Sequence, residues 1–124
     1  MNSFFRFALA VAALCCGQAI AAEYPNKPVR VIIAFPPGSA TDIVGRVISQ
    51  KVSELWGHQV IPDNRGGAGG SIASAIAAQA TPDGYTLLIN SNAHVVNPSM
   101  YKKLPFDTLK DFVNIMPLSG QPNV

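Results

Sequence analysis

The stretch Val29 to Phe35 reads VRVIIAF and ends at Pro36-Pro37-Gly38. Its side chains are almost all apolar and many are β-branched, without the alternation of a strand that has one solvated face. Such a run is typical of a strand buried on both faces of a parallel sheet, and the prolines and glycine after it favour a turn. We therefore predict that residues 29–35 form the first strand of an α/β domain.

The chain after this turn has helical spacing. Between Thr41 and Trp56, apolar residues recur every three or four positions while charged and amide side chains occupy the other side. Ser39 or Thr41 can cap the start of a helix, and Asp42 places a negative charge in its first turn. Gly57 can end it. We predict a helix from about Thr41 to Trp56.

The alternation of strand and helix continues along the chain. Gln59 to Pro62 is a short candidate strand, and Ser71 to Ala80 has the small residues of a helix that can pack closely. After a turn signal at Thr81-Pro82-Asp83-Gly84, Tyr85 to Ile89 is a third apolar strand. The order β-α-β-α-β predicts a parallel sheet with helices on both faces.

The last part of the sequence has less regular patterns. We expect a short helix over residues 97–102, a turn at Pro105-Phe106-Asp107 and one helical turn over residues 109–113. A fourth strand is expected near Asn114 to Leu118.

The composition favours one compact domain and excludes one class of partner. A chain of 124 residues with 48% hydrophobic side chains has room for a single core. Lys and Arg total 9 and Asp and Glu total 7, which leaves a net charge of +2. Nucleic-acid-binding proteins need a much more basic surface, so we expect no nucleic-acid partner.

The first residues have the pattern of an export signal. Met1 to Arg6 is a short positive start, Phe7 to Cys16 is an apolar run, and Ala19-Ile20-Ala21 is a small-x-small cleavage site. An apolar run of about ten residues is too short for a membrane span, which needs roughly 20 residues. We expect a cleaved signal peptide at residues 1–21 and a periplasmic mature domain at residues 22–124.

Both cysteines, Cys15 and Cys16, lie inside this signal. We therefore expect the mature chain to lack disulfides, thiol nucleophiles and thiolate metal ligands. A lipid anchor is a minor alternative, because a lipoprotein signal needs a small residue before its cysteine and Leu14 stands before Cys15.

In an open parallel α/β sheet, ligands bind outside the carboxyl ends of the strands. Three predicted loops meet at that edge, namely Pro36 to Thr41, Asn64 to Ser71, and Asn90 to Asn97. The first two lead into helix N-termini, whose unpaired N–H groups attract anions, and glycine lets a ligand oxygen approach the backbone. The loops therefore predict an anion site, although the same glycines can also serve only to make tight turns.

The residues exclude two nucleotide-binding motifs and a metal site. A dinucleotide fingerprint needs glycine where Ile72 stands, and a P-loop needs Gly-Lys-Ser or Gly-Lys-Thr where Gly69-Gly70-Ser71 stands. The histidines, His58 and His94, lack the spacing and carboxylate companions of a metal site. We expect no cofactor and no metal.

A small secreted serine hydrolase is the competing interpretation. Ser39, Ser71 and Ser91 are its candidate nucleophiles, with His94 and Asp42 as the other members of a triad. None of these serines stands in a Gly-x-Ser-x-Gly elbow. We therefore expect His94 to be a possible ligand contact and not a catalytic base, and the protein not to be an enzyme.

Three stretches of the chain, taken together, resemble a known family. They are YPNKPVRVIIAFPPGSATDIVGR, DNRGGAGGSIASAIAAQATPDGYTLLINSN and NPSMYKKLPFDTLKDFVNI. In order and spacing they are similar to the opening lobe of the substrate-binding receptors of tripartite tricarboxylate transporters, the Bug family. This resemblance implies a monomeric, two-lobed periplasmic receptor of type II-like fold. It also implies that the receptor captures a small carboxylate and passes it to membrane permease subunits without catalysis.

The resemblance further implies which residues surround a carboxylate, through backbone groups and ordered water. Carried over by matching motif, they are Pro37, Gly38, Ser39, Thr41 and Asp42 in the first loop, Gly67, Ala68, Gly69, Gly70 and Ser71 in the second, and Asn90, Ser91 and Asn92 in the third. We expect Arg65 to brace the second loop, with a direct contact to the anion as the alternative.

The sequence departs from the family pattern at three points. Ser39 stands where a second glycine is common, and Gly66 stands where proline is frequent after Asn-Arg. The chain also ends at Val124, whereas the family continues through a second lobe. We therefore expect a truncated product or a fragment that binds carboxylates weakly or not at all on its own. A non-functional fragment and a genuine single-lobe protein are the alternatives.

Overall fold

The computed structural model describes residues 23–120. The predicted signal peptide, residues 1–21, and its cleavage site lie outside the described residues. In chain order the elements are β1 (Val29–Ile33), α2 (Ala40–Trp56), β2 (Val60–Asn64), the 3-10 helix η1 (Ala68–Gly70), α3 (Ser71–Ala78), β3 (Thr86–Ile89) and α4 (Ala93–Met100). In this part of the chain, no helix has the length and apolar character needed to cross a membrane.

The strands of the described part form one parallel sheet in the order β2-β1-β3. Val31 of β1 lies opposite Pro62 of β2 and Leu87 of β3. The central strand is therefore bordered on both edges, which suits its continuous apolar sequence. This arrangement confirms the predicted β-α-β-α-β order and the parallel sheet.

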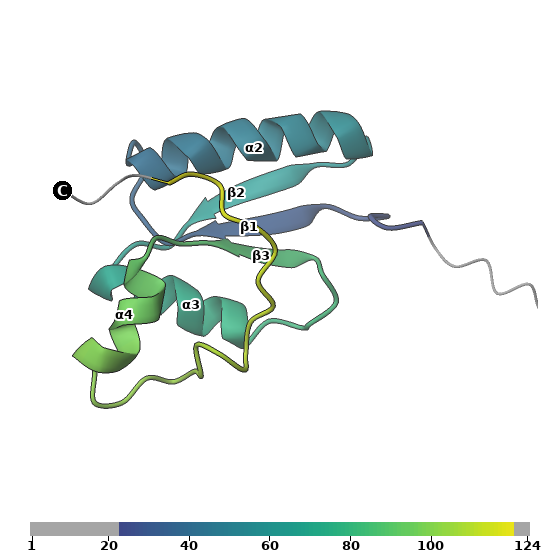
Figure 1. Ribbon diagram of the computed structural model, residues 1–124. Coiled ribbons are helices and arrows are strands. Elements are labelled where there is room, and N and C mark those ends of the chain that lie inside the picture. Colours follow the sequence, from purple (N-terminus) through teal and green to yellow (C-terminus); the bar gives the residue numbers. More distant parts are fainter. Residues whose placement is uncertain (1–22, 121–124) are drawn as a thin grey trace, which may run out of the picture.

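Helices cover both faces of the sheet, with α2 on one side of the strands and α3 and α4 on the other (Figure 1). Ile33 of β1 belongs to a cluster that packs with Val52 of α2. Ile32 belongs to the opposite cluster, which contains Ala73 of α3. Burying one side chain of this size contributes about 1.5–3 kcal/mol, so alternate residues of β1 stabilise both layers of the fold.

Helix α2 has defined ends and packs closely on the sheet. Ser39 Oγ accepts the Asp42 N–H at 3.2 Å, and Gly57 ends the helix at a φ of 66°. Both residues act as the sequence predicts. In the middle of the helix, a Cβ atom at Gly45 would lie 2.9 Å from Ile33 Cδ1. Glycine therefore lets α2 approach β1 and fixes the position of the loop between them.

Two predictions for the end of the chain are wrong. Among residues 23–120 there is no strand near Asn114 to Leu118, where Ile115 is 74% exposed. An apolar run cannot reveal whether a partner backbone is available, and strand formation depends on that partner. The short helix also begins earlier than predicted, at Ala93, and contains Pro98. Proline suits the first turn of a helix, but Pro98 lies in the second half of this one, so it does not mark the start.

Candidate functional site

The carboxyl ends of the strands meet at one edge of the sheet, on the left in Figure 1. Helices α2 and α4 and the 3-10 helix η1 all begin at this edge. Contacts join the loops that follow the strands. Asn64 Nδ2 donates to the carbonyl oxygen of Phe35 at 3.0 Å, and a Cβ atom at Gly70 would lie 2.6 Å from Asn90 Oδ1. The predicted loops are therefore neighbours in space.

The predicted ligand-binding residues lie at this edge but differ in exposure. The exposed ones are Pro37, Gly38, Gly67, Ala68, Gly69 and Asn92, and the half-buried ones are Ser39, Thr41, Ser71, Asn90 and Ser91. Asp42 and Gly70 are buried. Only part of the predicted set therefore offers surface to a ligand.

The carboxylate of Asp42 is fully engaged within the protein. One oxygen accepts the Gly38 N–H at 2.9 Å, and the other accepts the side-chain amide of Asn64 at 2.8 Å. The guanidinium of Arg46 donates to both oxygens, at 2.9 and 3.0 Å. Asp42 therefore joins the first loop to the end of β2, and it does not present a bare oxygen to a ligand.

These donors also set the charge state of Asp42. The hydrogen bond from Arg46 is the largest cause, followed by those from Gly38 and Asn64, and together they lower the pKa of Asp42 from 3.8 to about 2. Sequence reasoning missed both side-chain partners. The spacing of Asp42 and Arg46 on a helix is a recognisable i,i+4 pair. Nothing local indicates Asn64, which is 22 positions away.

The second loop is held in left-handed backbone conformations. The φ values of Gly67, Ala68, Gly69 and Gly70 are 128°, 47°, 60° and 82°. Such values favour glycine because a side chain would crowd the backbone. The missing side chains make room for neighbours, because an added Cβ atom would lie 2.6 Å from Asn90 Oδ1 at Gly70 and 2.7 Å from Ile72 Cδ1 at Gly67. At these positions the glycines serve the packing of the loop, and their role toward a ligand stays a prediction.

The start of α3 follows this loop and has no side-chain cap. Its N-cap residue is Gly70, and its first turn contains no acidic residue. The first turn of a helix carries unpaired N–H groups and about half a positive charge. Ser71 at the start of the helix is half-buried and follows the buried Gly70, and the three residues before Gly70 are exposed. The Ser71 N–H donates to the carbonyl oxygen of Ala68, so the later N–H groups of this first turn are the ones that remain. This helix end is thus open to a negatively charged group.

The polar side chains of the third loop mainly support the loop itself. Asn90 Oδ1 accepts the Ser91 N–H at 2.8 Å, and Ser91 Oγ accepts the Ala93 N–H at 3.2 Å. Asn90 also donates through Nδ2 to Ser74 Oγ at 3.1 Å. Only Asn92 of the predicted residues in this loop is exposed.

His94 lies on the first turn of α4, beside aromatic residues from the next segment. Its ring is parallel to that of Phe106, with centroids 6.0 Å apart, and meets the edge of Phe112 at 4.8 Å. Burial lowers the pKa of His94 below its ordinary value of 6.5. His94 Nδ1 lies 3.1 Å from Ser74 Oγ, a serine that sequence reasoning did not single out.

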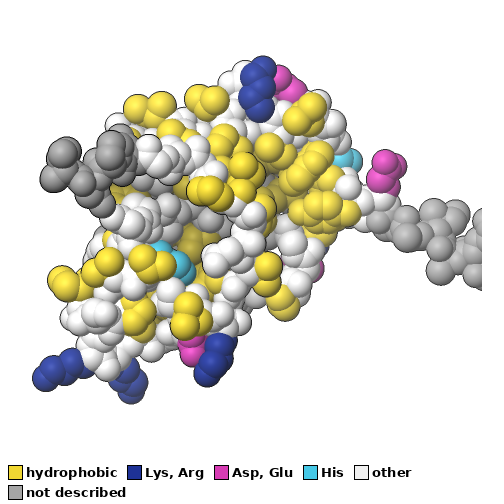
Figure 2. Space-filling view, in the orientation of Figure 1, with side chains coloured by type: hydrophobic (Ala, Val, Ile, Leu, Met, Phe, Trp, Pro, Cys, Tyr) yellow, Lys and Arg dark blue, Asp and Glu magenta, His cyan; other side chains and the backbone are white. Residues whose placement is uncertain are grey.

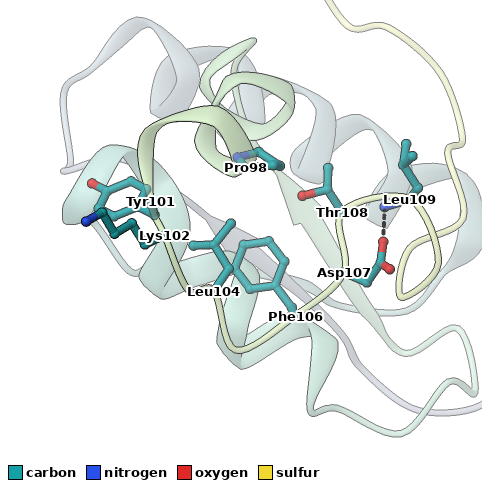
Figure 3. Close-up of a pocket in the computed structure, with 8 residues that line it drawn as sticks. All are labelled: Pro98, Tyr101, Lys102, Leu104, Phe106, Asp107, Thr108 and Leu109. Carbon is teal, nitrogen blue, oxygen red and sulfur yellow. Dashed lines mark hydrogen bonds between the residues drawn. The ribbon is translucent and has the colours of Figure 1, made fainter.

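Phe106 also lines a hollow of about 420 Å³ (Figure 3). It lies between the end of α4 and the following turn, where Asp107 Oδ1 accepts the Leu109 N–H at 3.0 Å. None of the predicted ligand-binding residues lines it. The hollow is therefore separate from the strand-end edge.

Ion pairs neutralise the arginines near the strand-end edge. Arg65 Nε lies 3.0 Å from Asp63 Oδ1, and Arg30 pairs with the same carboxylate. Arg46 pairs with Asp42. Figure 2 shows basic side chains at the margins of one face of the molecule, without a basic patch at its centre. These contacts favour the bracing role predicted for Arg65.

The serine triad of the competing hydrolase interpretation is not assembled at this edge. The serine that contacts His94 is Ser74, and this side chain is completely buried. Its hydroxyl also contacts Asn90 and the carbonyl oxygen of Gly70. A nucleophile must reach its substrate, so this serine and histidine pair is a structural contact.

Comparisons with known proteins identify the family. Residues 44–124 match TctC, the tripartite tricarboxylate transporter family receptor. The chain belongs to this family. It is 43% identical over 101 residues to a UPF0065 protein of the tcbD-tcbE intergenic region in a Pseudomonas species, covering 82% of this chain and 30% of that protein. It is 36% identical over 103 residues to BugT of Bordetella pertussis, covering 82% of this chain and 32% of that protein.

Solved structures of receptors resemble the described fold. The periplasmic binding protein BugD has a TM-score of 0.69 and 35% identity, covering 72% of this chain and 30% of that one. Rpa4515 of R. palustris with adipate has a TM-score of 0.67 and 32% identity, and the match covers 69% of this chain and 29% of that one. MatC of Rhodopseudomonas palustris with bound malate has a TM-score of 0.66 and 33% identity, and the match covers 72% of this chain and 31% of that one. The described α/β domain is thus the first lobe of a periplasmic solute-binding fold, and the chain spans about a third of the curated relatives it matches.

Proposed function

We propose that this chain supplies the first lobe of a periplasmic receptor that binds a small carboxylate and delivers it to the permease of a tripartite tricarboxylate transporter. The observation that carries this proposal is the open start of α3. The helix has no side-chain cap, and its buried N-cap Gly70 follows exposed residues at positive φ, at the strand-end edge where α/β proteins bind ligands.

The chemistry of this edge suits a carboxylate better than a neutral or cationic ligand. The Ser71 N–H already donates to the Ala68 carbonyl oxygen, so the next N–H groups of the first turn are the donors offered to an anion, and the helix dipole adds a partial positive charge. Arg65 and Arg46 are already paired with aspartates, so backbone donors and bridging water are the expected ligands of the anion. The adipate of Rpa4515 and the malate of MatC are ligands of this chemical class.

A charge placed at Ser71 tests this site directly. Ser71→Asp puts a carboxylate in the first turn of α3, where it favours the helix but repels a bound anion. Ser71→Asn is the matched control because it has the same shape without the charge. We expect the aspartate variant to bind L-malate or adipate about tenfold more weakly, about 1.4 kcal/mol, and the asparagine variant to bind within about twofold of the unmodified chain.

The measurement is a titration followed by backbone amide chemical shifts, which detects weak binding and locates it. We expect the largest shifts between Gly69 and Ala73. Thermal unfolding should show that Ser71→Asp is at least as stable as the control. Shifts confined to the hollow beside Phe106, or equal affinities for the two variants, would contradict the proposed site.

Export is part of the same proposal. The sequence of residues 1–21 predicts removal of a signal peptide on the way to the periplasm. Mass spectrometry of the protein from a periplasmic fraction is expected to find an N-terminus at Ala22 or Glu23. A protein that retains Met1 would overturn this part of the proposal.

A further inference from the structure

The hydroxyl of Ser74 has more polar neighbours than one proton can serve. It donates to the carbonyl oxygen of Gly70 at 3.1 Å, and it lies 3.1 Å from Asn90 Nδ2 and 3.1 Å from His94 Nδ1. The Ser74 side chain is completely buried, so water does not complete the set. The direction of each hydrogen bond can therefore be worked out from the neighbours.

The side chain of Asn90 has only one suitable orientation. The Ser91 N–H is a donor, and it lies 2.8 Å from Asn90 Oδ1. The amide nitrogen of Asn90 must then face Ser74 and donate to its oxygen. One lone pair of Ser74 Oγ is thus used by Asn90.

The remaining proton positions follow from the carbonyl of Gly70, which can only accept. If the Ser74 proton points to Gly70, His94 must donate from Nδ1, and all three contacts are hydrogen bonds. If the proton points to His94 instead, the oxygens of Ser74 and Gly70 face each other at 3.1 Å with no hydrogen between them. Leaving such a buried contact unsatisfied costs about 1–3 kcal/mol.

We infer that His94 is a positioning residue of the carboxylate site and carries its proton on Nδ1. Its N–H donates to Ser74, and the Ser74 hydroxyl in turn holds the carbonyl of Gly70 at the start of α3. The effect on ligand binding rests on the proposed function, whereas the proton position does not.

A second contact from the same helix acts on the adjacent carbonyl. Asn97 is 4% exposed, and its Nδ2 donates to the carbonyl oxygen of Gly69 at 3.0 Å. His94 and Asn97 are three residues apart, so they lie on one face of α4. Helix α4 therefore holds two successive glycine carbonyls, one directly and one through Ser74. The Ser71 N–H donates to the Ala68 carbonyl oxygen, so the later N–H groups of the first turn of α3 are the donors that this arrangement would present to a ligand.

The proton position can be measured on the unmodified chain without any ligand. Long-range ¹H–¹⁵N correlation spectra of the imidazole distinguish a protonated from an unprotonated ring nitrogen. We expect a protonated Nδ1 and an unprotonated Nε2 at neutral pH. A proton on Nε2, or an averaged mixture of the two forms, would overturn the inference even if the chain binds carboxylates.

Two substitutions test the positioning role. His94→Asn keeps an N–H donor close to the position of Nδ1, whereas His94→Leu removes the donor, and both remove the ring that contacts Phe106 and Phe112. We expect the asparagine variant to retain the amide chemical shifts of Gly70 and Asn90 and to bind L-malate within about threefold of the unmodified chain. The leucine variant should lose both, with at least tenfold weaker binding.

Equal behaviour of the two variants would show that His94 acts only through packing, which would overturn the inference. If the unmodified chain by itself binds L-malate too weakly to measure, as expected for one lobe of a two-lobed receptor, the affinities of the variants cannot be compared. The imidazole spectrum and the amide shifts of Gly70 then still decide whether His94 positions this turn.

Discussion

The starts of α2 and α3 lie at the same edge of the sheet, yet they are stabilised in opposite ways. At α2, Ser39 caps the helix and Asp42 occupies its first turn, with a buried carboxylate that accepts hydrogen bonds from three residues. At α3, the cap is Gly70, and the first turn has neither an acidic residue nor a side-chain cap. The start of α2 is capped by side chains of the protein, whereas the start of α3 has no side-chain cap and is the anion site that we propose.

The difference separates scaffold from site. The side chains around α2 join the first loop to β2 and fill the positive end of that helix with a charge of the protein itself. At the start of α3, side chains bond the backbone carbonyls instead. Ser74 donates to the carbonyl oxygen of Gly70 and accepts from Asn90, and Asn97 donates to the carbonyl oxygen of Gly69. A helix start without a side-chain cap suits an anion, which is why we propose the site there.

The largest expected effect compares two glycines at positive φ. Gly70→Val places a β-branched residue at a φ of 82° with its Cβ atom 2.6 Å from Asn90 Oδ1. Strain and crowding together should cost about 3 kcal/mol. Gly38→Val is the control, because Gly38 has a φ of 84° but no atom within 4 Å of the added Cβ, so only strain of about 1–2 kcal/mol is expected. Denaturant unfolding measures both, and equal losses would contradict the close packing at α3.

The second prediction concerns how the stability contributed by Asp42, in the first turn of α2, depends on pH. The folded-state pKa of Asp42 is lowered to about 2, so its contribution to stability is complete above the unfolded value of 3.8 and disappears as pH falls toward 2. Asp42→Asn removes this contribution. We expect the variant to melt at a clearly lower temperature than the unmodified chain at pH 7, with a difference that shrinks between pH 4 and pH 2.

The measurement is thermal unfolding followed by circular dichroism at a series of pH values. Other aspartates with lowered pKa values, such as Asp63 and Asp107, titrate in both proteins, so the difference between the two curves isolates Asp42. A difference that does not depend on pH would contradict the charged network around Asp42.

A third prediction compares serines at the two helix starts. Ser39→Ala removes the cap of α2 and should cost about 1 kcal/mol. Ser71→Ala removes no cap from α3 and should change stability by less than about 0.5 kcal/mol. Chemical denaturation of the two variants checks this. A loss as large at Ser71 as at Ser39 would show that α3 has a capping interaction of its own.

The sequence predicts the scaffold well because its signals are local. The apolar run of β1, the cap at Ser39 and the end at Gly57 each act within a few residues. Predictions fail where a distant partner decides the outcome. The segment at Asn114 to Leu118 has the composition of a strand but pairs with no strand of the described sheet.

In the candidate site, too, local features could be predicted from the sequence and contacts with distant residues could not. The loops and their glycines could be predicted, since turns and helix starts have local signals. The roles of Asn64, Ser74 and Asn97 could not, because each depends on contacts with a different part of the chain. Gly70 illustrates the limit. Its sequence context predicts an approach for a ligand, whereas the structure places Asn90 in that space.

The smallest expected effect is that of Arg65 in the second loop. Its side chain is 50% exposed and pairs with Asp63, which also holds Arg30. An exposed ion pair contributes no more than about 1 kcal/mol, so Arg65→Gln should lower stability only slightly. Because the backbone of the α3 start is the proposed anion ligand, this variant should bind L-malate within about twofold of the unmodified chain. Arg65→Lys keeps the charge and serves as the control in the same chemical shift titration. If Arg65→Gln binds at least tenfold more weakly and Arg65→Lys restores the affinity, the anion is held by the side-chain charge, and the open start of α3 is not its binding site.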